Sequence, residues 1–573
     1  MNYLDAFSEW EKALLNTEYD KDIAILKNDK ELLKDSFYKY LEFGTAGMRG
    51  IIGLGTNRMN IFTVRRSTKG LADYINSIDK AAEGVVIAYD SRHKSYEFAL
   101  ETALVLASNG IKAYLFKTLT SVPILSFSVI KLKCAAGVVI TASHNPKQYN
   151  GYKVYGADGG QLANEHANIV MSYINDIKDI FSIKPLSEEE ALKSGLLTYV
   201  GEELYNEYFK NVVSLCMDLD IIKQQADSLK VVYTPLHGTG NIPVYTILSK
   251  IGIKNVYIVP EQKYPDPDFP TVKAPNPEEK DTFSLAIKLA NEKGANMILA
   301  TDPDCDRLGI AVRESENEFK LLTGNQIGCL LLDYILMQNQ KSKVKDGFAV
   351  KSIVSTNMAN VIAEYYCVEM REVLTGFKYI AEQINLSLKT KKGTFLFGFE
   401  ESYGFLAGTF VRDKDAAIAS MLVVEAACYY ASKNMTLYDA LNSLFEKYGY
   451  FKEEVVSITL SGIEGQSKIL AAVETLRKEC PKKIGQFKVN VFKDYLLNEC
   501  TDCQTNEKTH IDLPKSDVLG FYMDDVRFII RPSGTEPKLK SYLNVRGKTA
   551  KEANDRFAEL KSSVNEFLNE LTK

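Results

Sequence analysis

The sequence predicts an α/β protein with three related mixed-sheet α/β domains and a smaller α+β C-terminal domain. Six short apolar runs, each ending abruptly in polar residues, predict strands buried on both faces. Helical patterns lie between these runs, and the runs fall into three successive pairs. From about Tyr450 onward, short strands around turns replace this pattern. We therefore expect domains at residues 1–208, 209–323, 324–447 and 448–573.

The elements follow one another in a regular order along the chain. The six predicted strands are Val85–Ala88, Gly137–Ile140, Val231–Tyr233, Met297–Ala300, Phe348–Ile353 and Thr394–Phe397. Helices are predicted at Ser95–Asn109, Asp281–Glu292 and Thr356–Tyr366. The C-terminal part is expected to hold strands at Gln486–Phe492 and Phe528–Ile530 and a helix at Ala550–Leu571. Function in α/β sheets concentrates where strands end in loops, so the polar strand ends are the first place to look for chemistry.

The composition is that of a globular protein: 46% of the 573 residues are hydrophobic, 25% are charged, and the net charge is -5. Lys and Arg are scattered, so no nucleic-acid or membrane-surface patch is expected. No apolar run approaches the ~18 residues of a membrane span, and no secretory signal pattern opens the sequence. Nine irregularly spaced cysteines fit a reducing, cytoplasmic setting. Cys500 and Cys503, with Cys480 and His510 nearby, make only a weak zinc candidate, because two well-spaced ligand pairs are missing.

Small and hydrogen-bonding residues follow the second predicted strand, in the run Thr141-Ala142-Ser143-His144-Asn145-Pro146. This arrangement would expose Ser143 at the end of a buried strand. A serine-hydrolase reading fails because the G-x-S-x-G elbow is absent. Alone, the run is also consistent with a capped turn closed by proline.

Three carboxylates follow the fourth predicted strand, in Asp302-Pro303-Asp304-Cys305-Asp306-Arg307. Alternate side chains of an extended segment face the same way, so the three carboxylates should converge. Such a cluster is costly without a cation, and oxygen ligands suit Mg²⁺. An EF-hand is excluded because Arg307 and Arg313 occupy the places of its glycine and its final glutamate. The alternative is a solvated acidic turn.

Two further polar segments are ambiguous when taken alone. The run Arg531-Pro532-Ser533-Gly534-Thr535-Glu536-Pro537-Lys538 offers a guanidinium fork and free backbone N–H groups to a phosphate, or is an ordinary charged turn. The run Gly398-Phe399-Glu400-Glu401-Ser402-Tyr403-Gly404 suits sugar hydroxyls, or is the start of a helix. Lys378, within Thr375-Gly376-Phe377-Lys378, shares this ambiguity. No Walker A motif is present, and the glycines of 50–55 lack the context of a dinucleotide fingerprint.

Taken together, these motifs resemble the α-D-phosphohexomutase superfamily, in whose order they occur from about Phe43 to Lys538. The phosphoglucomutase and phosphopentomutase branch is the most similar. The residues that carry this resemblance are Phe43-Gly44-Thr45-Ala46-Gly47-Met48-Arg49-Gly50, the Ser143 loop and the Gly-Phe-Glu-Glu-Ser run. Other branches have Ser-Gly-His in the sugar loop, where this chain has Ser402-Tyr403-Gly404, which argues against phosphomannomutase and phosphoglucosamine mutase activity.

The resemblance implies that the four domains surround a central cleft, and it implies roles for individual residues. Ser143 would be the phosphoserine and, through a phosphate oxygen, a fourth ligand to Mg²⁺ beside Asp302, Asp304 and Asp306. The sugar phosphate would be contacted by Arg307, Thr375, Gly376, Lys378, Glu400 and Ser402, and its non-transferring phosphate by Arg531, Ser533, Gly534 and Thr535. Arg49, His144, Lys153 and Lys378 would line the catalytic centre, with Lys153 and Lys378 as candidates for proton transfer.

The implied activity is the interconversion of glucose 1-phosphate and glucose 6-phosphate through glucose 1,6-bisphosphate, which would also serve as activator. The protein is expected to be a monomer or a homodimer. A phosphopentomutase acting on ribose or deoxyribose phosphates is the alternative. A phosphomannomutase is a further alternative, which the sugar loop argues against. A non-catalytic phosphosugar-binding protein is another, which the complete motifs argue against. A third is a phosphatase, in which water rather than the sugar accepts the phosphoryl group.

Overall fold

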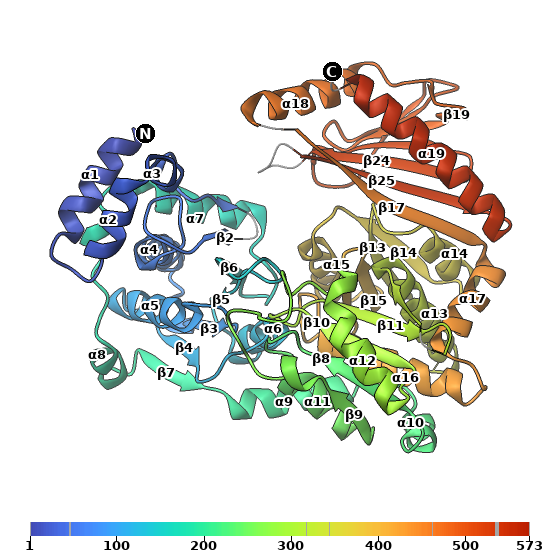
Figure 1. Ribbon diagram of the computed structural model, residues 1–573, viewed down its shortest axis with the longest axis horizontal. Coiled ribbons are helices and arrows are strands. Elements are labelled where there is room, and N and C mark those ends of the chain that lie inside the picture. Colours follow the sequence, from blue (N-terminus) through green and yellow to red (C-terminus); the bar gives the residue numbers. More distant parts are fainter. Residues whose placement is uncertain are drawn as a thin grey trace.

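The computed structural model describes residues 2–44, 47–316, 318–342, 344–460, 462–532 and 538–571. Within these ranges the chain forms four large sheets and one two-stranded sheet. The large sheets follow one another along the chain, and helices cover the first three of them (Figure 1). The predicted fold class, three mixed-sheet α/β units and a β-rich C-terminal unit, is confirmed.

The first unit holds a seven-stranded sheet. Its strands are β1 Phe43–Gly44, β2 Gly47–Ile51, β3 Val85–Tyr89, β4 Ala113–Phe116, β5 Ala136–Ile140, β6 Tyr149–Gly156 and β7 Leu197–Val200. Its helices are α1 Tyr3–Leu14, α2 Asp20–Asn28, α3 Lys30–Phe37, α4 Ile61–Ser77, α5 Ser95–Ser108, α6 Val122–Leu132, α7 Asn164–Asp176, α8 Glu188–Lys193 and α9 Glu202–Val213. The spatial order is β1-β2-β6-β5-β3-β4-β7. The pairs among β5, β3, β4 and β7 are parallel, and those among β1, β2, β6 and β5 are antiparallel.

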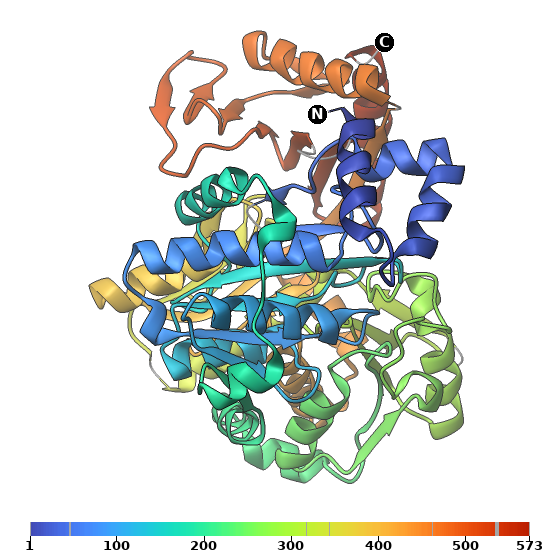
Figure 2. The ribbon, with the colours of Figure 1, turned by 90° about the vertical axis from the view of Figure 1, so that its left-hand side faces the viewer.

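The first three helices form a small bundle of their own, which stands at one end of this unit (dark blue in Figure 2). Trp10, the only tryptophan of the chain, lies at the centre of this bundle and is 2% exposed. The indole makes edge-on contacts with Phe37 of α3 and Phe62 of α4. This aromatic cluster therefore attaches the N-terminal bundle to α4.

The second and third units have smaller mixed sheets. The second contains β8 Lys230–Thr234, β9 Asn255–Ile258, β10 Met297–Thr301, β11 Leu308–Arg313 and β12 Phe319–Leu322, with α10 Leu219–Gln225, α11 Asn241–Lys250 and α12 Ser284–Lys293. The third contains β13 Gly347–Ser352, β14 Glu369–Val373, β15 Thr394–Glu400 and β16 Gly404–Leu406, with α13 Gly324–Ser342, α14 Met358–Tyr365, α15 Phe377–Thr390, α16 Ala416–Ala431 and α17 Leu437–Tyr448. The orders are β12-β11-β10-β8-β9 and β14-β13-β15-β16. Helix α16 is buried almost throughout and packs on α10, α11 and α13, so it joins the two units.

The fourth unit is one antiparallel sheet with two long helices. Its elements are β17 Tyr450–Thr459, α18 Gly462–Lys478, β18 Lys483–Ile484, β19 Phe487–Lys488, β20 Val491–Asp494, β21 Glu499–Asp502, β22 Lys508–His510, β23 Leu519–Met523, β24 Val526–Pro532, β25 Lys538–Gly547 and α19 Ala550–Leu571. The large sheet has the order β17-β25-β24-β23-β20-β21-β22. Phe528 and Ile530 of β24 belong to the core beneath the helices, whereas Ile529 between them packs with Ile353 and Val354 of the third unit. The two-residue period of the strand thus separates an internal core from a contact between units.

Five of the six predicted strands fall on β3, β5, β8, β10 and β13 to within one residue at each end, and the sixth falls on β15, which continues three residues further, to Glu400. The helix Ala550–Leu571 is confirmed with these bounds. The single strand predicted at Gln486–Phe492 is wrong, because this stretch is divided between two sheets. Gly485, at φ +56°, turns β18 back onto β19, and the Asn490 amide then donates to Tyr522 of the large sheet. The apolar pattern runs through this change of sheet and so conceals it.

No helix within the described ranges is long and apolar enough to cross a membrane.

Candidate active site

Ser143 lies in the loop that follows the carboxyl end of β5. Its side chain is 3% exposed, and its Oγ donates to Oδ2 of Asp302 at 2.7 Å. The Nδ1 atom of His144 lies 3.2 Å from the same Oγ. Ser143 has a φ of +52°, a left-handed conformation that a non-glycine residue keeps only where its surroundings enforce it. The loop therefore holds the serine hydroxyl against the acidic residues of the second unit.

Arg92, which the sequence analysis did not single out, holds this loop in place. Its guanidinium group donates to the carbonyl oxygens of Ser143, Asn145, Pro146 and Tyr149 at 2.5–3.2 Å. Buried Asp90 pairs with Arg92 at 3.3 Å. Asp90 and Arg92 lie in the run Tyr-Asp-Ser-Arg at the end of β3. This polar end of a strand next to β5 is the sequence feature that could have identified them.

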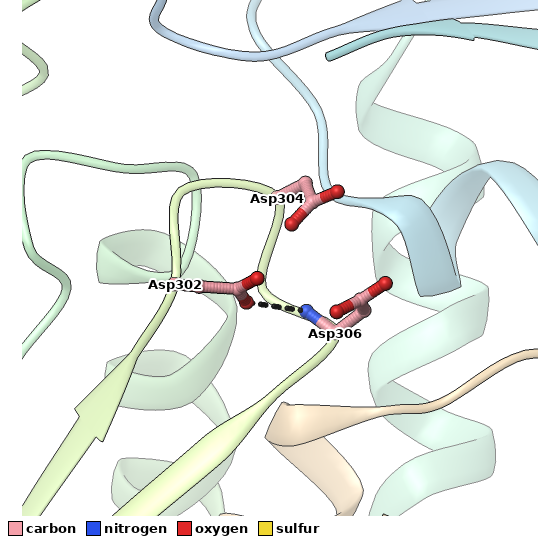
Figure 3. Close-up of side chains that lie close together, drawn as sticks. All are labelled: Asp302, Asp304 and Asp306. Carbon is pink, nitrogen blue, oxygen red and sulfur yellow. Dashed lines mark hydrogen bonds between the residues drawn. The ribbon is translucent and has the colours of Figure 1, made fainter. Parts of the chain in front are cut away.

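Asp302, Asp304 and Asp306 occupy the loop between β10 and β11 and point toward one another (Figure 3). All three are at most 2% exposed, and one oxygen from each lies within 4.8 Å of the others. The backbone N–H of Asp306 donates to Oδ1 of Asp302 at 3.1 Å. Cys305, at φ +55°, makes the turn that brings the three together. The predicted convergence is therefore present.

Two lysines neutralise part of this cluster. Nζ of Lys153 lies 2.9 Å from Oδ2 of Asp304, and Nζ of Lys414 lies 3.1 Å from Oδ2 of Asp306. Burial acts to raise the pKa of Asp304, but Lys153, the hydrogen bond with Asp302 and the charge of Lys414 together outweigh it and hold this pKa below its usual value. Burial and the neighbouring carboxylates raise the pKa of Asp302 well above its usual value.

The donor set fits a hard divalent cation. Oδ1 of Asp304 and Oδ1 of Asp306 are buried and have no hydrogen-bond partner. Orphaned buried carboxylate oxygens are costly unless a cation coordinates them, and all-oxygen sites favour Mg²⁺ or Ca²⁺. Within the described residues, this is the cluster of His, Cys, Asp and Glu side chains that could hold a metal, and the weak zinc candidate around Cys500 and Cys503 is not among such clusters.

The other residues expected at the catalytic centre lie around this cluster. Nη1 of Arg49, the exposed residue of β2, donates to Oδ1 of Asn145 in the Ser143 loop at 2.9 Å. Arg307 pairs with Glu278 at 2.5 Å and lies 3.9 Å from Asp306. Burial, together with the charges of Arg307 and Arg49, lowers the pKa of His144 well below its usual value, so the ring is neutral at pH 7.

The predicted sugar loop joins β15 to β16 and is linked to the acidic cluster through the backbone. Leu308 donates its N–H to the carbonyl of Tyr403, next to an isolated bridge between Arg307 and Gly404. Glu400 is 5% exposed, and its Oε1 accepts the N–H of Gly376 at 2.7 Å. Burial and the adjacent Glu401 raise the pKa of Glu400 to about 7.

The remaining residues of this loop region are available for a ligand. Ser402 is half-buried beside Glu401, and the buried Oγ1 of Thr375 has no hydrogen-bond partner. A cavity of about 440 Å³ adjoins the loop and is lined by Glu278, Gly324, Glu401, Tyr403 and Tyr542, among others. Its lining comes from the second, third and fourth units, and its volume is typical of a small-molecule site.

Lys378 and Arg531 do not touch the acidic cluster. Nζ of Lys378 donates to Oδ1 of Asn164 in the first unit at 2.5 Å, and burial lowers the pKa of Lys378. Arg531 lies half-buried at the end of β24 opposite Lys540 of β25. Burial and the charge of Arg531 lower the pKa of Lys540, which identifies a local concentration of positive charge. Ser533, Gly534 and Thr535 lie outside the described residues.

Lys414 is a second residue that sequence reasoning missed. It is 7% exposed and bridges Asp306 and Asp413, whose carboxylate lies 2.8 Å from its Nζ. Although burial opposes it, these two carboxylates raise the pKa of Lys414. Its signal in the sequence is a charged run, Arg-Asp-Lys-Asp, immediately before the apolar helix α16.

Comparison with protein families finds three matches, each described as a phosphoglucomutase/phosphomannomutase alpha/beta/alpha domain. Domain I matches residues 40–180, domain II residues 206–315 and domain III residues 323–448.

Curated relatives match over most of the chain. A phosphoglucomutase of Staphylococcus epidermidis is 42% identical over 506 residues, which cover 88% of this chain and 90% of the relative. A phosphoglucomutase of Staphylococcus aureus is 39% identical over 514 residues, covering 90% of this chain and 91% of the relative.

Solved structures share the fold. The open form of parafusin, a phosphoglucomutase of Paramecium, superposes with a TM-score of 0.68 at 16% identity, covering 93% of this chain and 95% of that one. A phosphomannomutase structure from Thermus thermophilus gives 0.67 at 19% identity, covering 93% and 99%.

Proposed function

Because the chain belongs to the phosphoglucomutase/phosphomannomutase family, within the α-D-phosphohexomutase superfamily, we propose that it interconverts glucose 1-phosphate and glucose 6-phosphate. It is accordingly an isomerase that acts as an intramolecular phosphotransferase. The observation that carries the proposal is the contact of 2.7 Å between Oγ of Ser143 and Asp302. This contact places a nucleophilic hydroxyl from the first unit on an acidic cluster from the second.

We propose that Ser143 carries the phosphoryl group. The phosphoryl group passes from Oγ to the free hydroxyl of the bound sugar phosphate, which gives glucose 1,6-bisphosphate. After the bisphosphate turns around, its other phosphoryl group returns to Ser143 and the isomeric monophosphate leaves. Added glucose 1,6-bisphosphate activates by phosphorylating free Ser143.

Side chains of the protein transfer the proton and position the phosphoryl group. In the proposed mechanism Lys153, the buried ammonium group beside the triad, gives a proton to Oγ of Ser143 as the phosphoryl group leaves and takes the proton of the sugar hydroxyl in exchange. His144 and Arg49 position the phosphoryl group on the Ser143 side. Lys378 is the second candidate for proton transfer and would act at the opposite end of the sugar. Its support is the hydrogen bond from its Nζ to Asn164, which brings this lysine of the third unit to the first unit.

Asp302, Asp304 and Asp306, with a phosphoryl oxygen on Ser143, are proposed to hold Mg²⁺. When bound, the ion would neutralise charge on the transferring oxygens. The two orphaned carboxylate oxygens support this assignment.

We propose that the sugar is held by the loops of the third unit and its second phosphate by the fourth. Arg307, Thr375, Gly376, Glu400 and Ser402 face the sugar in this proposal. Arg531, with Ser533, Gly534 and Thr535, grips the phosphate that is not transferred. The positive charge around Arg531 supports the phosphate site. The cavity of about 440 Å³ is lined by Glu401 and Tyr403, which flank Ser402, and so lies beside the proposed sugar site.

The units 1–208, 209–323, 324–447 and 448–573 are proposed as the four domains, since each contains one of the large sheets. A cytoplasmic location is also proposed, and its support is that all nine cysteines are free thiols.

The alternative is a phosphopentomutase, because the sugar loop offers carboxylates and a hydroxyl that suit pentose and hexose alike. Side-by-side kinetics on glucose 1-phosphate and ribose 1-phosphate distinguish the two. We expect kcat/KM to favour the hexose; a preference for the pentose would contradict the proposed substrate. Trapping the bisphosphate intermediate separates a mutase from a phosphatase.

The carrier role is tested with Ser143→Ala. We expect turnover to fall by orders of magnitude, because no other hydroxyl contacts Asp302 in the described structure. Intact-mass measurement should show one phosphate on the wild type after incubation with glucose 1,6-bisphosphate and none on the variant. Ser172→Ala, which removes an exposed hydroxyl from α7, is the matched control and should behave as the wild type. Near-normal activity of Ser143→Ala would rule out the carrier role.

A further inference from the structure

Arg66 is a buried arginine outside the catalytic centre. It lies on α4 and is 8% exposed. Its guanidinium group stacks on the ring of Tyr40, 4.0 Å from the centroid, and its Nε has no hydrogen-bond partner. Among the described residues, no carboxylate pairs with it.

Two other arginines in the same region each pair with a carboxylate, unlike Arg66. Arg65, the preceding residue of α4, pairs with Glu101 at 2.5 Å. Arg58, which is also buried, pairs with Asp35 at 2.5 Å. A buried charge without a partner is strongly unfavourable, so Arg66 lacks a counter-charge that its neighbours have.

A cavity of about 100 Å³ opens beside Arg66, between α4, α7 and the hairpin of β1 and β2. Helices α4 and α7 pack on each other, and Figure 1 shows both in the same part of the first unit as β2. Ser67 also lines the cavity, and its hydroxyl is buried and directed only to the sulfur of Met48 at 3.6 Å, which is a weak acceptor. The cavity thus contains a guanidinium group and a hydroxyl that are both free to donate.

The carboxylate of Glu42 is the acidic group on the rim. Its side chain is 63% exposed and pairs with Lys39 at 3.1 Å. Burial lowers the pKa of Arg66, and the ion pair that Glu42 makes among the described residues is with Lys39 and not with Arg66. Glu42 therefore leaves the guanidinium group uncompensated.

We propose that this cavity is a binding site for a small tetrahedral oxyanion, inorganic phosphate or sulfate, held by Arg66 and Ser67. An engineered apolar cavity of about 150 Å³ holds benzene, so about 100 Å³ admits an ion of five heavy atoms. The planar fork of arginine matches two oxygens of such an ion, and the serine hydroxyl can donate to a third.

The cavity adjoins β2, the strand that contacts the Ser143 loop. Met48 of β2 lines the cavity. Arg49, the next residue of the strand, points to the opposite face of the sheet and donates a hydrogen bond to the Ser143 loop. A bound anion would therefore support the hairpin from the face opposite the catalytic centre.

The test compares thermal unfolding of the wild type and Arg66→Met in potassium phosphate, potassium sulfate and potassium chloride at equal ionic strength. An anion that binds the folded state alone raises its midpoint. We expect Arg66→Met to be at least as stable as the wild type in chloride, because an uncompensated charge is removed. In phosphate or sulfate its midpoint should rise less than that of the wild type. Anion binding at the catalytic centre is common to both proteins and cancels in the comparison.

Arg65→Met is the matched control, since it removes the adjacent arginine together with an ion pair, and it should lose stability equally in all three salts. If Arg66→Met also loses stability equally in all three, Arg66 serves only to pack on Tyr40 and the proposal is overturned. If Glu42→Gln lowers stability in chloride and gains a response to phosphate, Glu42 is the counter-charge and the proposal again fails. A response to phosphate and not to sulfate identifies phosphate as the ion.

A direct measurement does not depend on the folding of any variant. Crystals of the wild-type protein soaked in selenate, which replaces sulfate, should show an anomalous peak within hydrogen-bond distance of the Arg66 guanidinium group. Absence of that peak at a concentration that fills the catalytic centre would refute the site.

Discussion

At the scale of single residues, opposite charges from different units meet at the catalytic centre. Lys153 belongs to the first unit, Asp304 and Asp306 to the second, and Lys414 to the third. Each ion pair between them is buried. Removing one partner of a buried pair leaves the other uncompensated, so substitutions here should affect both activity and stability.

For Asp304→Asn we expect turnover to fall at least a hundredfold and the Mg²⁺ concentration for half-maximal activity to rise, because one ligand charge is lost and Lys153 loses its partner. Activity titrations with Mg²⁺ after treatment with EDTA measure both effects. Asp220→Asn, which breaks an exposed pair with Lys223, should leave both unchanged. Wild-type activity that survives EDTA would contradict the metal assignment.

Glu400→Gln tests the raised pKa of about 7. In the unfolded chain the carboxyl group ionises near 4.5, so between these values the folded state binds more protons and wild-type stability falls as pH rises. The loss should reach about 3 kcal/mol above pH 7, at 1.36 kcal/mol per pKa unit. Unfolding midpoints from pH 4 to 8 should therefore show Glu400→Gln gaining on the wild type as pH rises. Exposed Glu446→Gln should follow the wild type, and parallel curves for Glu400→Gln would show that the carboxyl group titrates normally.

At the scale of elements, the ends of strands explain what the sequence could predict. Ser143 and the three aspartates directly follow buried strands, so local pattern was sufficient to find them. Arg92 and Lys414 have partners among their neighbours, Asp90 and Asp413, but their contacts with the Ser143 loop and with Asp306 join groups far apart in the chain, which local pattern does not reveal. The division of Gln486–Phe492 between two sheets was missed for the same reason, since pairing partners decide it.

Gly324 at the start of α13 sets the position of the sugar loop. A Cβ atom there would lie 2.1 Å from the carbonyl oxygen of Glu401 and 2.8 Å from the amide nitrogen of Tyr403. Gly324→Ala must displace this backbone, at a cost of about 1–3 kcal/mol for overpacking. We expect KM for the sugar phosphate to rise several-fold and the unfolding midpoint to fall. Gly201→Ala, whose Cβ would meet nothing within 4 Å, is the control. Unchanged KM in Gly324→Ala would separate this loop from sugar binding.

At the scale of the whole molecule, the fourth unit contributes a separate wall to the cavity beside the sugar loop. It rests on the third unit through a small apolar contact that includes Val354, Ile529 and Tyr542. Small contacts between domains permit relative motion, and closure over a bound intermediate would exclude water.

Arg531→Ala tests the phosphate grip. Contacts made equally in the ground state and the transition state appear chiefly in KM, and a charge-assisted contact contributes about 1.5–3 kcal/mol. We expect KM for the sugar phosphate to rise roughly tenfold to a hundredfold, with a smaller loss in kcat. Arg531→Lys should restore little, because an ammonium group lacks the planar fork.

Steady-state kinetics at saturating Mg²⁺ and activator make this measurement. Arg556→Ala, an arginine of α19 whose nearest acidic groups, Asp525 and Glu552, are 3.8 Å away, should leave KM unchanged. If Arg531→Ala also leaves it unchanged, the fourth unit does not bind the substrate phosphate.

The pairing of Lys153 and Lys414 with the acidic triad also has a thermodynamic consequence. Lys153 and Lys414 already pair with Asp304 and Asp306 before any ion binds, while Lys414 also pairs with Asp413 and Arg307 with Glu278. A phosphoryl group on Ser143 would bring nearly two negative charges to the same place, and these attract a divalent cation at the triad. Each should therefore strengthen the binding of the other. Because such coupling is reciprocal, the factor by which phosphorylation tightens metal binding equals the factor by which the metal stabilises the phosphorylated serine.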